Sequence, residues 1–129
     1  MTGGLRAGPF STVAWLDNEV VRIAVAGEID VATSTQLKFV LLAAIQTPST
    51  ARDVTVDLAE VTFMDASGVG VLVAGREAAR RRGVGFTVQN PQGIVLRVLD
   101  LLGLAEAMQL DHGLAGIEDR GLPPHLRQQ

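Results

Sequence analysis

Two kinds of hydrophobic pattern alternate along this chain, and each predicts one kind of element. Residues 20–27 are rich in β-branched side chains, which predicts a strand that pairs with an earlier strand at 11–16 through a turn at Asp17-Asn18. Apolar and polar residues alternate over 53–58 and again over 84–88, which predicts two more strands. The chain therefore begins with an antiparallel hairpin, and the later strands follow helical segments.

The segment after the hairpin predicts a helix. Its apolar residues recur at helical spacing: Leu37, Val40, Leu41, Ala44 and Ile45. Asp30, Thr33 or Ser34 is available as the N-cap. We expect the helix to end near Thr47, because the residue before a proline is disfavoured in helical conformation and Pro48 follows.

Two further helices are predicted after the later strands. A helix that starts around Ser67 is predicted to end at three successive arginines followed by Gly83. The arginines complement the negative end of the helix dipole, and the glycine supplies the left-handed residue that follows the helix. The last helix is predicted to start at Asn90 as N-cap, with Pro91 in the first helical position. Its apolar residues are Ile94, Val95, Val98, Leu101 and Leu102.

The order of these elements predicts the fold class and the extent of the domain. Strand–helix–strand units of this length imply right-handed crossovers. We therefore expect a single α/β domain with a mostly parallel sheet, an antiparallel N-terminal hairpin and helices packed on the sheet. The domain is expected over 11–110, after a flexible N-terminus at 1–10 and before a C-terminal tail at 111–129. Residues 105–110 predict a short last strand.

Composition narrows the class of protein. A chain of 129 residues with 47% apolar residues is long enough for one domain with a substantial core. The absence of cysteine excludes disulfides and thiolate metal sites and fits a reducing cytoplasm, where we expect the protein. A net charge of -3 provides no basic field for nucleic acid. No apolar run approaches the roughly 18 residues of a membrane span, so neither nucleic acid nor a membrane is expected as a partner.

Motifs for serine hydrolysis and for nucleotide binding are absent. A nucleophile elbow needs a glycine two residues before and two after its serine, and Asp65 and Val69 stand there around Ser67. Neither a G-x-G-x-x-G nor a G-K-[ST] motif is present. The two histidines, His112 and His125, lie in a weakly patterned stretch, and we interpret both as solvated loop residues. We therefore expect neither enzymatic activity nor a cofactor.

Three aspartates at the predicted strand ends have two interpretations. Asp30, Asp57 and Asp65 could gather and hold a hard cation. Aspartates at such junctions more often cap helices, and capping is the interpretation that we favour. No metal site is expected.

Ser67 stands at a predicted helix N-terminus, and its position also has two interpretations. Serine before a helix is a common N-cap that needs no further function. The unpaired N–H groups and the helix dipole would equally support a phosphate on this hydroxyl. Asp65 is a competing cap, and Gly68 and Gly70 weaken the first turn while leaving its backbone accessible to a partner. Ser67 is therefore a candidate phosphorylation site.

These segments match a known pattern between residues 11 and 110. The matching pieces are Gly27-Glu28-Ile29-Asp30, Val54 to Leu58, Val61-Thr62-Phe63-Met64, Asp65-Ala66-Ser67-Gly68-Val69-Gly70-Val71, and Val98 to Leu104. In them the chain resembles the STAS domain family, the anti-sigma-factor antagonists and their relatives. The D-x-S-G-x-G segment between a strand and a helix is the most specific piece. Ala66 departs from the pattern, since many family antagonists carry a second hydroxyl residue there.

The resemblance implies a partner-switching protein. Unphosphorylated, it would bind an anti-sigma factor that is also a serine kinase, and so free a sigma factor. Phosphorylation of Ser67 would weaken this complex, and a metal-dependent serine phosphatase would restore it. The resemblance also implies a partner surface made of Asp30 and the start of the helix that contains Ser67: Asp65, Ala66, Ser67, Gly68, Val69 and Gly70.

Two other functions remain open on the sequence. The chain could be a phosphorylation-independent accessory subunit of a transporter or other assembly, as STAS-like modules are in some transporters. It could also bind a small anionic ligand near Asp30 and Ser67, at the helix N-terminus. Whether Ser67 is phosphorylated in the native host separates the accessory role from the switch.

Overall fold

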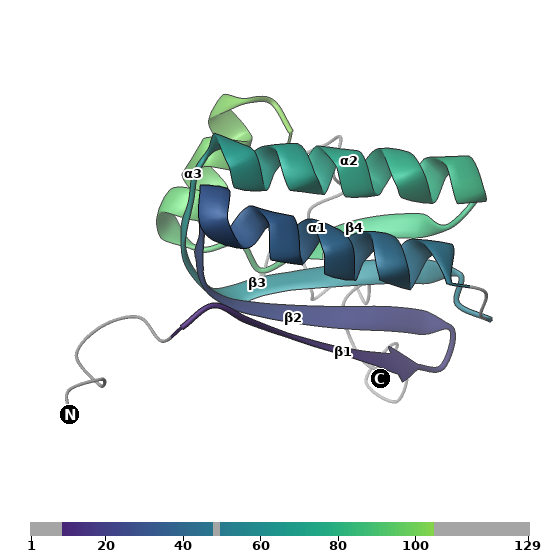
Figure 1. The fold of residues 1–129 in the computed structure, drawn as a ribbon. Helices are drawn as coiled ribbons and strands as arrows, with labels where there is room; N and C mark the ends of the chain where they lie inside the picture. Colours follow the sequence, from purple (N-terminus) through teal and green to yellow (C-terminus); the bar gives the residue numbers. More distant parts are fainter. Residues whose placement is uncertain (1–8, 48–49, 105–129) are drawn as a thin grey trace, which may run out of the picture.

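A computed structural model describes residues 9–47 and 50–104, in which strands and helices alternate as predicted (Figure 1). The elements in chain order are β1 (Ser11–Asp17), β2 (Val20–Ile29), α1 (Val31–Gln46), β3 (Asp53–Met64), α2 (Ala66–Arg82), β4 (Gly85–Gln89) and α3 (Gly93–Leu101).

The four strands form one sheet in the order β1-β2-β3-β4. β1 is antiparallel to β2, whereas β2, β3 and β4 are parallel. The predicted α/β fold with an N-terminal hairpin is therefore confirmed. The hairpin turn comes one residue later than predicted, because β1 continues through Asp17 and Asn18 takes the left-handed conformation with φ 58°.

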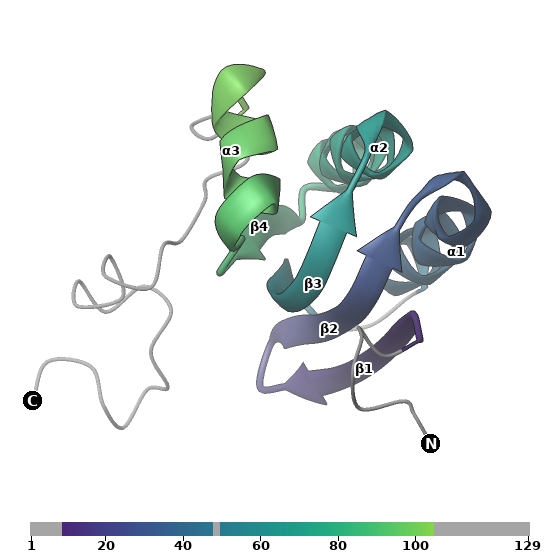
Figure 2. The ribbon, with the colours of Figure 1, turned by 90° about the vertical axis from the view of Figure 1, so that its left-hand side faces the viewer.

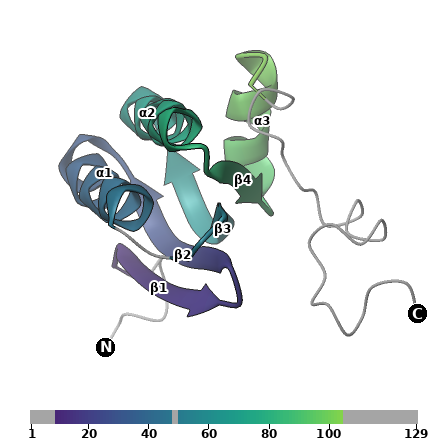
Figure 3. The same cartoon turned by 90° about the vertical axis from the view of Figure 1, so that its right-hand side faces the viewer.

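Helices α1 and α2 lie side by side on one face of the sheet (Figures 1 and 3), and α3 packs against β3. Alternate strand residues point to this face, and burying each of their apolar side chains stabilises the fold by about 1.5–3 kcal/mol. The buried core of the sheet and the two helices includes Ile23, Val25, Val54, Val56, Val88, Leu37, Leu41, Ile45 and Leu72.

Strand β3 is longer than the sequence pattern predicts. The strand was expected over 53–58, yet it continues to Met64. Its pairing with β2 shifts register between Ala24 and Ala26, and in the same region the Asp57 carboxylate accepts a hydrogen bond from the Ala59 N–H at 2.9 Å. This irregularity interrupts the alternation of apolar residues, so the second half of the strand does not follow the pattern of the first.

The predicted start of the last helix is wrong. The N-cap of α3 is Gln92, not Asn90, and the helix begins at Gly93. Asn90 instead adopts φ 57°, and its side-chain amide donates to Asp57 Oδ1 at 3.2 Å. Val95 and Leu99 are the buried residues of α3, one turn apart, whereas three residues of the predicted apolar face are exposed: Ile94, Leu101 and Leu102.

The predicted ends of the first two helices are confirmed. Thr47 is the C-cap of α1, and Gly83 ends α2 in the left-handed conformation with φ 70°. The predicted strand over 105–110 and the predicted domain boundary at residue 110 lie outside the described residues, and so do both histidines.

Candidate functional site

The ends of β2 and β3 place two aspartates next to one another. Ile29 and Met64, the last residues of these strands, pair across the sheet, and each is followed by an aspartate, Asp30 and Asp65. The Asp65 N–H donates to the Ile29 carbonyl at 3.1 Å. The C-terminal ends of β2 and β3, drawn as arrowheads, and the starts of α1 and α2 consequently lie at the same end of the sheet (Figure 2).

Asp30 caps α1 through a reciprocal pair of hydrogen bonds with Thr33. The Thr33 N–H donates to Asp30 Oδ1 at 3.1 Å, and the Asp30 N–H donates to Thr33 Oγ1 at 2.9 Å. The Thr33 hydroxyl in turn donates to the Glu28 carbonyl at 2.8 Å. This capping box satisfies two backbone donors and fixes the direction in which α1 leaves the sheet.

Asp65, rather than Ser67, caps α2. Its Oδ1 accepts from the backbone N–H of Ser67 at 2.9 Å and of Gly68 at 3.4 Å. Ser67 is the second residue of the helix, and its hydroxyl donates to the same oxygen at 2.5 Å. This hydroxyl bond, assisted by the backbone donors, holds the pKa of the Asp65 carboxyl below its ordinary value. The serine hydroxyl is therefore oriented by a charged acceptor at the start of the helix.

The three aspartates that could have held a cation have other partners. Asp30 and Asp65 are helix caps, which confirms the capping interpretation for these two. Asp57 lies within β3 and accepts from the Ala59 N–H and the Asn90 amide. Within residues 9–47 and 50–104, no three His, Cys, Asp or Glu side chains form a group that could hold a metal ion.

Ser67 opens onto a groove between the two helices, which we call the α1–α2 groove. It has a volume of about 270 Å³ and is lined by Ser34, Thr35, Lys38, Ser67, Gly70, Val71 and Ala74. Lys38 is the single lysine of the chain and the cation among these residues. Sequence reasoning did not connect Ser34, Thr35 and Lys38 with Ser67. Their spacing places them on one side of α1, but only the packing of the helices brings that side to α2.

The candidate partner residues differ in exposure. Ala66 and Gly70 are exposed, and Ser67 is half-buried, as are Asp30 and Asp65. Gly68 and Val69 are buried in the fold, and Val69 contributes to the core. Our expectation that Gly68 leaves its backbone open to a partner is thus wrong, since its side of the helix faces inward.

The glycines of this first turn have different surroundings. A Cβ on Gly68 would lie 2.7 Å from both Ile29 Cγ2 and Met64 Cγ, which is too close for a methyl group. A Cβ on Gly70 would meet no atom within 4 Å. Core packing thus accounts for Gly68 and leaves Gly70 unexplained.

Val31, the first residue of α1, adds an apolar side chain that is 74% exposed, which sequence reasoning also missed.

Comparisons with known proteins identify relatives of this arrangement. A family model described as the Mlab STAS domain matches residues 12–114. An anti-sigma-B factor antagonist of Staphylococcus epidermidis is 29% identical over 96 residues, which cover 74% of this chain and 87% of the relative. The protein of the same name from Bacillus subtilis is 26% identical over 90 residues, covering 70% of this chain and 80% of the relative.

Solved structures share the fold. The crystal structure of an anti-sigma factor antagonist from Mycobacterium paratuberculosis matches with a TM-score of 0.72 at 25% identity, covering 79% of this chain and 85% of that protein. Unphosphorylated SpoIIAA, also an anti-sigma factor antagonist, matches with a TM-score of 0.68 at 23% identity, covering 89% of this chain and 99% of that protein.

Among the helices of the described residues, none has the length and apolar character that a membrane span needs.

Proposed function

The chain belongs to the STAS domain family, and from this premise we propose that it is an anti-sigma-factor antagonist switched off by phosphorylation of Ser67. Unphosphorylated, it binds an anti-sigma factor that is also a serine kinase, and a serine phosphatase restores the bound state. The names of the curated relatives, which match along most of their length, support the antagonist role. Ser67 is a substrate in this scheme, and the chain itself performs no catalysis.

The observation that carries the proposal is the setting of the Ser67 hydroxyl. It lies in the first turn of α2, opens onto the α1–α2 groove and donates to Asp65 at 2.5 Å. A phosphate on this oxygen removes the donated proton and places about -1.5 to -2 charges beside the Asp65 carboxylate. The hydrogen bond is then lost and like charges repel. The helix N-terminus and Lys38, across the groove, attract the phosphate in its place.

The surface around Ser67 is suited to close approach by another protein. Val31 and Ala66 are exposed and apolar, and Gly70 is exposed with no side chain. Glycine within a helix costs about 1 kcal/mol relative to alanine. Because no packing contact requires Gly70, a bare backbone that a partner can reach is a physical reason for this cost. A phosphate at Ser67, one turn away, adds bulk and charge to the same surface.

The partner surface proposed here comprises residues from the starts of both helices. Asp30, Asp65, Ala66, Ser67 and Gly70 contact the anti-sigma factor, while the buried Gly68 and Val69 support the turn from beneath. An added phosphate desolvates poorly in such an interface, and a loss of about 1.4 kcal/mol already weakens binding tenfold.

The test compares four proteins immobilised separately and exposed to lysate of the native host. They are the wild type, Ser67→Ala, Ser67→Asp and the control Thr50→Asp. Thr50 is exposed and precedes β3, at the end of that strand away from Ser67, so an aspartate there adds the same charge at a distance. Mass spectrometry identifies the retained proteins and any phosphate on Ser67. The retained anti-sigma factor is then titrated against each variant.

We expect the wild type, Ser67→Ala and Thr50→Asp to retain a kinase-like anti-sigma factor, and Ser67→Asp to bind it at least tenfold more weakly. Equal affinities of the wild type and Ser67→Asp would contradict the switch. Capture of the same transporter subunits by all four proteins, with no phosphate on Ser67, would replace it with the accessory-subunit function.

A further inference from the structure

Strand β1 is an edge strand of the described sheet, and its own sequence lacks several of the usual protective features. Within the described residues it pairs with β2 along one side, and its other side is the edge of the sheet. Natural edge strands are commonly protected by lysine, proline, bulges or short length. β1 has the sequence STVAWLD, contains neither lysine nor proline, and pairs with β2 in unbroken register over all seven residues. Among residues 9–47 and 50–104, no strand pairs with its outer backbone groups, and we take them as open to another strand.

Apolar side chains surround this open edge. Trp15 is 46% exposed and Leu16 54% exposed on β1, and Phe39 of α1 is 75% exposed. Between β1 and the C-terminal half of α1 lies a groove of about 420 Å³, lined by Ala14, Leu16, Phe39, Val40 and Ala43 among others. We call it the β1 groove. Exposed apolar clusters of this kind mark interaction sites on monomeric proteins.

We propose that a second copy of this chain occupies the edge, with the two β1 strands antiparallel about a two-fold axis at Ala14. The register is self-complementary. Ala14 lies opposite Ala14 of the other copy, Val13 opposite Trp15, Thr12 opposite Leu16, and Ser11 opposite Asp17. The two four-stranded sheets become one continuous sheet.

Side-chain chemistry favours this occupant. Val13 opposite Trp15 is a β-branched–aromatic pair, which stabilises antiparallel strands. The single charge of β1, Asp17, faces a serine and is already engaged by Arg22 at 3.0 Å, so no like charges meet across the axis. Alanine at the axis leaves room for its own symmetry mate.

The same symmetry joins the two β1 grooves. Thr12, Ala14 and Leu16 point to the face that carries α1, since Ala14 pairs with the core residue Ile23 and Leu16 with Val21. An axis perpendicular to the sheet keeps both α1 helices on this face, antiparallel to one another. Phe39 of each copy then covers the Leu16 side chains beneath it.

This inference goes beyond the switch and is independent of it. The β1 groove runs along the C-terminal half of α1, from Phe39 to Thr47, whereas the α1–α2 groove involves Ser34, Thr35 and Lys38. Pairing through β1 leaves Ser67 accessible in both copies. Each dimer presents two switch surfaces.

Cysteine cross-linking tests the register, because the chain contains no cysteine. Directly opposed residues in antiparallel strands have Cα atoms about 4.5–5.5 Å apart, within the span of a disulfide. Ala14→Cys is therefore expected to form a covalent dimer in oxidised glutathione. The control Ser11→Cys is not, since the two copies of residue 11 are offset by roughly 20 Å along the strands.

Sedimentation velocity of the full chain tests the interface without cross-linking. We expect a dimer in the wild type, at least tenfold weaker association in Trp15→Lys and in Val13→Lys, and unchanged association in Leu101→Lys. Leu101 is exposed on α3 and serves as the matched control. Circular dichroism confirms that each variant is folded.

Three kinds of result would overturn the inference. The first is a wild type that stays monomeric up to about 100 μM, a concentration at which a specific interface of moderate affinity is populated. The second is a dimer that Trp15→Lys and Val13→Lys leave intact, or equal cross-linking of both cysteine variants. The third is a monomer whose binding of the anti-sigma factor is lost in Trp15→Lys, which would assign the edge to that partner instead.

Discussion

At the scale of single residues, the glycines of α2 have separate physical explanations. Gly68 packs against Ile29 and Met64 with no space for a methyl group. A Cβ on Gly75 would lie 3.2 Å from the side chains of both Leu41 and Phe86. These two let α2 lie close to the sheet and to α1. Gly70 has no such constraint, which leaves it available to the partner surface proposed above.

Alanine substitutions separate these explanations. We expect Gly68→Ala to destabilise the fold by about 1–3 kcal/mol, because the added methyl group must displace buried side chains. Gly70→Ala is expected to stabilise it by about 0.5–1 kcal/mol, because alanine favours the helix and meets no neighbour. Urea unfolding followed by circular dichroism measures both.

The two glycine variants also bear on the partner surface. If Gly70 is kept for access, Gly70→Ala binds the anti-sigma factor more weakly while being more stable. Gly70→Ala that is both more stable and equally tight in binding would remove this support for the proposed surface. A neutral Gly68→Ala would contradict the packing argument.

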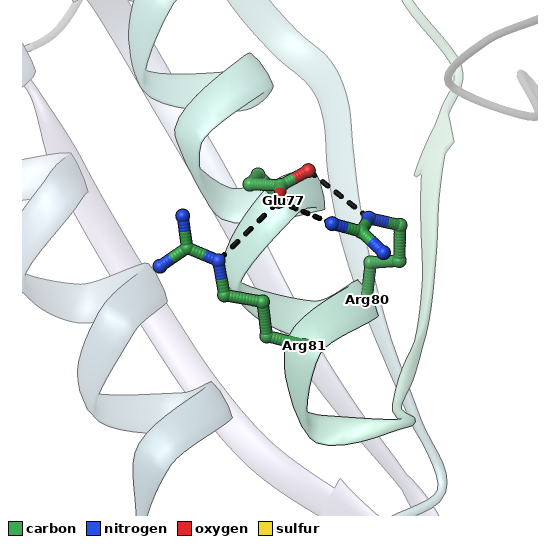
Figure 4. Close-up of polar contacts among 3 residues, drawn as sticks. All are labelled: Glu77, Arg80 and Arg81. Carbon is green, nitrogen blue, oxygen red and sulfur yellow. Dashed lines mark hydrogen bonds and ion pairs between the residues drawn. The ribbon is translucent and has the colours of Figure 1, made fainter.

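At the scale of the element, α2 carries perturbed carboxylates near both ends. Asp65 accepts the Ser67 hydroxyl and backbone N–H groups at the start of the helix. Near its end, Glu77 accepts from Arg80 at 2.6 Å and from Arg81 at 3.3 Å (Figure 4). Hydrogen bonding and the charge of Arg80, with a smaller effect of Arg81, lower the pKa of Glu77 to about 2. Both arginines also complement the negative end of the helix dipole.

These lowered pKa values predict that α2 contributes to acid sensitivity. A carboxylate whose pKa is lower in the folded state stabilises the fold above its unfolded pKa, and this stabilisation is lost as pH falls through the folded value. For Glu77 the loss falls between about pH 4.5 and pH 2. We expect the free energy of unfolding to decrease over this range, and the decrease to be smaller in the double variant Asp65→Asn, Glu77→Gln.

Urea unfolding at a series of pH values measures this dependence. Asparagine retains the capping oxygen, so the double variant keeps the helix start while removing the titrating groups. The exposure of the pair with Arg81 limits the effect, which salt reduces further. An unchanged slope in the double variant would show that carboxylates elsewhere dominate the acid response.

At the scale of the whole molecule, one core connects the sheet with helices α1 and α2. Leu37 and Leu41 of α1, Leu72 of α2 and Val56 of β3 are all fully buried in a single cluster. Elements that share a core of this kind lose their packing together, and small single domains commonly unfold in one step.

Leu41→Ala tests this cooperativity. We expect it to lower the free energy of unfolding by about 2–5 kcal/mol, through lost burial and the cavity that remains, and to leave a single transition. Differential scanning calorimetry compared with circular dichroism measures both properties at one protein concentration. Leu101→Ala, at an exposed position, is the control and should change stability by less than about 0.5 kcal/mol. A second transition in Leu41→Ala would show that α1 unfolds separately.

The sequence alone determined the order of elements, the hairpin, two helix ends and the segment that contains Ser67. These features depend on local spacing, proline and glycine, so periodicity and end signals are sufficient. The D-x-S-G-x-G segment likewise indicated the family from neighbouring residues alone. The predicted start of α3 was wrong, because Asn90 adopts the left-handed conformation and its side chain donates a hydrogen bond to Asp57, a residue 33 positions away.

Only the tertiary structure decided the features that depend on pairing and packing. β3 reaches Met64 because β2 supplies hydrogen-bond partners beyond the irregularity, although the apolar alternation is interrupted there. The packing of α1 against α2 brings Lys38 to the groove of Ser67, and the packing of α2 against the ends of β2 and β3 leaves Gly68 no space for a side chain. Periodicity shows which residues share one face of an element. What that face meets is set by contacts between distant parts of the chain.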